Sequence, residues 1–145
     1  MWARRSALPI FLLNLSCSRP APSVHLGDLR IEPGYVNASP AGDGGSAYFT
    51  IRNAGSLADT MTGVAVAGAS PAQLHTLAAS GRMTPLEHAV VPAGGALALR
   101  PGQAHLMFEG MPRKLALGDS IAMSLRFARA GAVSVPLAVE PYGGR

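Results

Sequence analysis

The chain has 145 residues, of which 48% are hydrophobic and 14% charged, with 17 glycines and 12 prolines. This composition argues against a disordered chain, which would be poor in apolar residues. It also argues against a helical bundle, because glycine and proline break long helices. The length suits one domain. The net charge of +4 comes from scattered residues, so the concentrated basic surface of a nucleic-acid-binding protein is not expected.

Residues 1–16 have the features of a signal peptide. Two arginines precede an apolar stretch that is too short to span a membrane. Cys17 follows directly, in a context similar to the lipobox of bacterial lipoproteins, where the cysteine is acylated. We predict lipidation of Cys17 and a short tether over residues 17–23; cleavage nearby, which would discard Cys17, is the alternative. Either route places the mature protein outside the cytoplasm, in the periplasm or on the outer face of the membrane.

The remaining chain alternates between apolar and polar residues in short runs that turn signals separate, a pattern typical of β-strands. A slip near Gly27 indicates a bulge in the first strand, and residues 37–45 are expected to form a flexible loop. We therefore predict an all-β domain over residues 24–140, a cupredoxin-like or immunoglobulin-like antiparallel sandwich of eight or nine strands, followed by a tail at 141–145. The expected strands are 24–32, 47–52, 59–67, 72–77, 84–91, 96–100, 105–108, 120–128 and 132–139.

The sequence lacks the local motifs of common enzymes. It contains no GxSxG, P-loop or HExxH pattern, and its acidic residues are dispersed. We predict that the protein is not an enzyme.

The methionines divide into two groups by their place in the pattern. Met61 and Met123 lie on the apolar faces of predicted strands, where methionine commonly fills gaps in a core. Met83 and Met107 lie at strand ends or beside turns. Thioethers in such positions are candidates for binding rather than for packing in the core.

His105 and Met107 are two residues apart in a predicted strand, so both side chains project from the same face. Imidazole binds many transition metals, and thioether sulfur favours Cu(I). A hairpin from His75 to Met83 would bring two more donors of the same kinds together. His88 lies outside this spacing, and we expect it to be a structural or surface residue.

This arrangement resembles the extracytoplasmic copper chaperones of the PCuAC (DUF461-like) family, whose signature is H-x10-M-x21-H-x-M. Met83, His105 and Met107 match the second half of that signature in spacing, whereas only seven residues separate His75 from Met83. A hairpin shorter by three residues would explain the difference. The segments AYFTIRNAG, ADTMTGVAV, QLHTL and PGQAHLMFEGMPRKLALGDSIAMSLRF also resemble the family, over most of residues 24–140.

The resemblance implies a Cu(I) site formed by His75, Met83, His105 and Met107. It implies a monomeric metallochaperone that passes copper to an acceptor, either a subunit of cytochrome c oxidase during assembly of its copper centre or another copper chaperone. The membrane would be contacted only through a lipid on Cys17. Two other functions remain open: a secreted β-sandwich that binds a partner without metal, and copper storage or detoxification.

Overall fold

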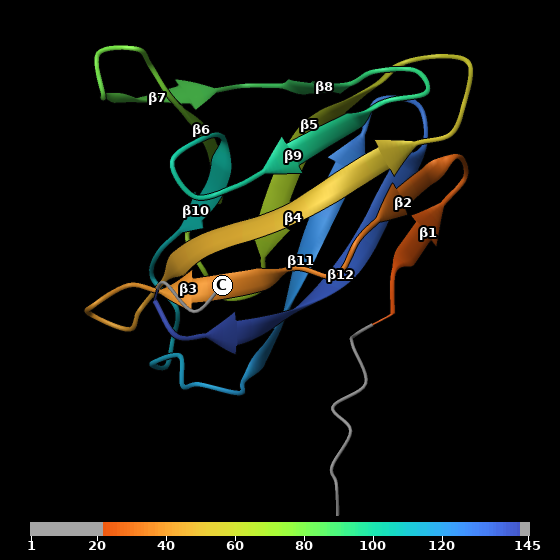
Figure 1. The fold of residues 1–145 in the computed structure, drawn as a ribbon. Helices are drawn as coiled ribbons and strands as arrows, with labels where there is room; N and C mark the ends of the chain where they lie inside the picture. The colour runs from red at the N-terminus through yellow and green to blue at the C-terminus, as the bar shows by residue number, and fades with distance from the viewer. Residues whose placement is uncertain (1–21, 143–145) are drawn as a thin grey trace, which may run out of the picture.

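The computed structural model describes residues 22–142, which contain twelve β-strands and no helix (Figure 1). No helix in this part of the chain is long and apolar enough to cross a membrane. The predicted signal peptide and Cys17 lie outside the described residues. The all-β prediction is confirmed. The strands are β1 Val24–Leu26, β2 Leu29–Ile31, β3 Tyr35–Ala38, β4 Gly45–Asn53, β5 Asp59–Val66, β6 Gln73–Leu77, β7 Met83–Leu86, β8 Ala89–Val91, β9 Ala96–Leu99, β10 His105–Phe108, β11 Ser120–Phe127 and β12 Gly131–Glu140.

The strand β4 connects the two sides of the fold. Its first half pairs with β3 and β10, and its second half pairs with β2 and β9. The main strand order is β7-β6-β10-β4-β3-β12-β11-β5-β8, which curls into the nearly closed shape seen in Figure 1. The strand pairs are antiparallel, as the sequence predicted, except β3–β12, which is parallel and was not predicted.

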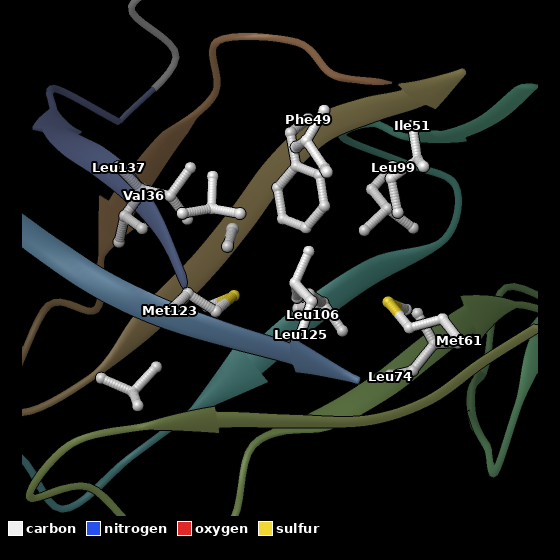
Figure 2. Packing of buried hydrophobic residues seen from close by; sticks show 14 of the residues in the cluster. Val36, Phe49, Ile51, Met61, Leu74, Leu99, Leu106, Met123, Leu125 and Leu137 are labelled. Atoms are coloured by element: carbon white, nitrogen blue, oxygen red, sulfur yellow. The ribbon is translucent and has the colours of Figure 1, made fainter. Parts of the chain in front are cut away.

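Inward-facing residues of the strands fill one hydrophobic interior. Figure 2 shows side chains from several strands pointing toward one another there. Met61 and Met123 are 3% and 0% exposed, so their predicted place in the core is confirmed. The fully buried large side chains are Phe108, Ile31, Ile51, Leu99, Leu106, Met123, Leu125, Leu137, Val36 and Val91.

The structure has twelve strands instead of eight or nine because two predicted strands are divided and one was not foreseen. The expected bulge at Gly27 is wrong: Gly27 has a φ of +56° and, with Asp28, forms a tight turn that pairs β1 with β2. The predicted strand 84–91 is interrupted between β7 and β8.

The unforeseen strand β3 begins at Tyr35, and its last two residues lie in the segment 37–45 that we expected to be a loop. Gly45 on β4 packs closely against β3: a Cβ atom on Gly45 would lie 2.5 Å from the carbonyl oxygen of Asn37. Glycine there lets β4 approach β3, although glycine in a sequence usually signals a turn.

Candidate metal site

His75 on β6 and His105 on β10 are directly paired across the two strands. Their ring centroids are 6.0 Å apart, with the ring planes inclined by 50°. The next pair along, Leu74 and Leu106, is buried in the core. Because successive side chains alternate between faces, the two imidazoles lie on the outer face of the sheet.

The ring of His105 is held in a fixed orientation. Its side chain is only 8% exposed, and its Nδ1 atom lies 2.9 Å from the backbone carbonyl oxygen of Gln103. Since a carbonyl can only accept, Nδ1 carries the proton in the neutral ring, and Nε2 keeps the lone pair that a metal needs. Tyr48 flanks the ring on the β4 side, with centroids 6.3 Å apart.

The ring of His75 lacks a hydrogen bond like the one that orients His105. Its Nδ1 atom is buried and has no hydrogen-bond partner among the described residues. Burial lowers the pKa of His75, and the nearby His105 lowers it further. Both effects favour the neutral imidazole, which is the form that binds a metal.

Met107 lies beside the two histidines, next to a pocket. It pairs with Gln73 and, two residues after His105, shares its face. Met107 and His75 both line a cavity of about 270 Å³, which we call the Met107 pocket. Its other walls are Ser70, Pro71, Gln73, Phe108 and Glu109.

Met83 lies on the other side of His75. It pairs with Leu77 at the start of β7, whereas His75 itself pairs with Pro85. This register makes Met83 a diagonal neighbour of His75 on the same face, at a Cα separation of roughly 7–8 Å, which is within reach of a long side chain. Met83 is 53% exposed. The structure thus groups His75, His105 and Met107 closely and leaves Met83 on the exposed hairpin.

Other donor residues lie apart from this group. His88 is exposed in the segment between β7 and β8. Among residues 22–142, no three or more His, Cys, Asp or Glu side chains are arranged to hold a metal ion. A metal on this face would therefore depend on the methionine sulfurs as well as the imidazoles.

Sequence reasoning missed three residues around the site: Tyr48 beside His105, and the pocket residues Gln73 and Glu109. Tyr48 belongs to the AYFTIRNAG segment, but nothing in that segment shows which residue it contacts. Gln73 could have been found from its place two residues before His75, since both then share a face.

The described residues form an all-β domain that groups two histidines and a methionine on one sheet face. The family model described as "Putative lipoprotein LpqE-like" matches residues 29–139. The chain belongs to this LpqE-like family. A relative from Leifsonia xyli, named "Putative lipoprotein Lxx21020", is 31% identical over 137 residues, which cover 91% of this chain and 81% of the relative.

Solved structures share the same fold. The copper-bound PCuAC domain from PmoF2 has a TM-score of 0.73 at 23% identity, covering 83% of this chain and 99% of that domain. The Cu(I) form of DR1885 from Deinococcus radiodurans has a TM-score of 0.61 at 24% identity, covering 83% of this chain and 81% of that protein. The predicted resemblance to PCuAC domains is thereby confirmed for the fold.

Proposed function

We propose that this protein is an extracytoplasmic copper chaperone that binds one Cu(I) ion through His75, His105 and Met107, with Met83 as the fourth ligand. The observation that carries the proposal is the direct pairing of the two histidines beside Met107 on one sheet face. The copper-bound state of the structurally similar domains from PmoF2 and DR1885 supports it.

The chemistry of the donors favours Cu(I) over other ions. Thioethers are soft ligands that select Cu(I), whereas imidazole also serves harder ions. All four donors are neutral, so they leave the positive charge of the ion uncompensated. An acceptor that offers thiolates can therefore take the copper, which suits delivery better than permanent storage.

The N-terminal sequence and the family support a place of action outside the cytoplasm. A signal peptide of lipoprotein type, and relatives described as lipoproteins, support a mature protein held at the outer face of the membrane by a lipid on Cys17. The acceptor we propose is a copper protein there, either the cytochrome c oxidase subunit that receives copper or another copper chaperone.

Anaerobic titration of the mature protein with Cu(I) tests this function. We expect a stoichiometry of one, and we expect His105→Ala to weaken binding by more than the roughly 10–100-fold that loss of an outer-shell partner costs. His25→Ala is the matched control, because His25 lies on β1 beside a different pocket. A wild-type protein that binds no Cu(I), or a His105→Ala variant that binds as well as wild type, would contradict the proposal.

A further inference from the structure

The Met107 pocket adjoins two of the proposed ligands from one side. Its volume of about 270 Å³ is below the roughly 300–1,000 Å³ typical of sites for drug-sized molecules. His75 and Met107 form part of its wall, so a group that enters the pocket comes next to an ion held by them. The pocket therefore suits a side chain better than an organic cofactor.

The approach from the β4 side is blocked. His105 is buried, its Nδ1 atom is bonded to the Gln103 carbonyl, and the ring of Tyr48 packs beside it. A new ligand could reach the ion from this side only if the His105–Gln103 hydrogen bond and the contact between the Tyr48 and His105 rings were broken.

On the far side of His75, the Met83 ligand is loosely held. Met83 is more than half exposed, and every residue of its strand β7 is exposed. Few packing contacts would oppose movement of this side chain away from the ion. Met83 is thus the ligand that leaves most easily, and it lies on the diagonal opposite to Met107.

Resting on the proposed function, we propose that the Met107 pocket is the entrance for a donor side chain of the acceptor protein, a cysteine thiolate or histidine imidazole carried on a protruding loop. The new bond to copper forms on the pocket side, and the bond to the Met83 sulfur breaks on the other side. Copper remains Cu(I), so no electron is transferred. The thiolate arrives deprotonated, so no proton moves in this step.

The polar walls of the pocket favour a protein loop as the occupant. Ser70, Gln73 and Glu109 supply a hydroxyl, an amide and a carboxylate. These oxygens can accept hydrogen bonds from the backbone N–H groups of a loop.

Two tryptophan substitutions on β6 distinguish the two sides of the site. Gln73 and Leu77 are both exposed, and they lie two residues before and after His75 on the same face. Gln73→Trp fills the pocket, and Leu77→Trp obstructs the Met83 side to a similar extent. For each variant, equilibrium Cu(I) affinity is measured first, followed by the rate of copper transfer to a Cys-X-X-Cys peptide without oxygen.

We expect Gln73→Trp to slow the transfer by about tenfold or more while leaving affinity unchanged, because an obstacle on the approach path raises the barrier to ligand exchange without altering the bonds to the bound ion. Leu77→Trp should transfer copper at nearly the wild-type rate. The assignment is wrong if Gln73→Trp transfers as fast as wild type, or if Leu77→Trp is slowed as much.

A second pocket variant keeps this test decisive where Gln73→Trp folds poorly or loses affinity. Ser70→Phe fills the same pocket from its loop wall, away from the strands that carry the ligands. The equilibrium titration separates the two proposals. A wild-type protein without Cu(I) affinity overturns the copper function itself, whereas normal affinity with unaltered transfer in the filled variants overturns only the entrance.

Discussion

His75 and His105 stand directly opposite each other on β6 and β10, with ring centroids 6.0 Å apart. They are separated by 29 residues in the sequence, and only the register of the two strands brings them together. The same register places Met107 diagonally from His75, and the β6–β7 hairpin places Met83 on the opposite diagonal. His75 is thus the centre of the candidate site, with one methionine on each side.

The contrast between buried and exposed methionines predicts different effects on folding. Met123 is fully buried, so Met123→Ala should lower the free energy of unfolding by about 2–5 kcal/mol. Met83 is exposed, so Met83→Ala should change it by no more than about 0.5 kcal/mol. Denaturant unfolding of the copper-free protein measures both values. An equal loss of stability in the two variants would show that Met83 packs in a core of its own.

Asp59 should stabilise the fold in a pH-dependent manner. Burial alone would raise the pKa of Asp59, but the backbone N–H groups of Thr60, Arg129 and Ala130 donate to its carboxylate and hold the pKa below the ordinary value of 3.8. A carboxyl group with a lowered pKa in the folded state stabilises the protein fully above its ordinary pKa. That contribution is lost as the pH falls through the lower, folded-state pKa.

We therefore expect Asp59→Asn to lower the free energy of unfolding by about 1–3 kcal/mol at neutral pH. The difference from wild type should shrink as the pH falls below about 4. Glu87→Gln, which removes an exposed carboxylate, is the control and should be nearly neutral. A deficit for Asp59→Asn that stays constant down to pH 2 would contradict this role for the charge.

Cys17 should anchor the mature protein to a membrane. An acyl chain together with a diacylglyceride supplies more than the single chain that gives only marginal binding. Fractionation of cells that express wild type or Cys17→Ala measures this directly, with the wild type expected in the membrane fraction and the variant in the soluble fraction. The lipoprotein prediction fails if both proteins are found in the soluble fraction.

His88 should be dispensable for copper. It is exposed between β7 and β8, outside the group of donors around His75. We expect His88→Ala to bind Cu(I) with a stoichiometry near one and with unchanged affinity in a chelator competition. A loss as large as that caused by His105→Ala would show that the short hairpin recruits His88 in place of His75.

Local patterns predicted most of the strands and the shared face of His105 and Met107, because alternation within a strand is a property of neighbouring residues. The partner of His105 could not be derived in the same way, since strand order and register depend on packing across the whole core. Gly45 shows a further limit. A glycine that permits close approach of two strands has the same sequence appearance as one in a flexible loop.

The hairpin between β6 and β7 is the place where this chain differs from the family pattern. The spacing from His75 to Met83 is three residues shorter than the PCuAC signature. In this structure Met83 lies within the strand ladder, opposite Leu77. The sequence predicted a shared site for the four donors, and the participation of Met83 in it stays a prediction.

Competition for Cu(I) against a Cu(I)-specific chelator, run beside a thermal melt, tests the central claim most directly when the Met83→Leu, Met107→Leu double variant is compared with wild type. Leucine conserves volume, so stability should change by less than about 1.5 kcal/mol. Because the substitution removes both soft donors, Cu(I) affinity should fall steeply while the melt is nearly unchanged. A double variant that holds Cu(I) as tightly as wild type would show that neither methionine binds the ion and would contradict the copper-chaperone account.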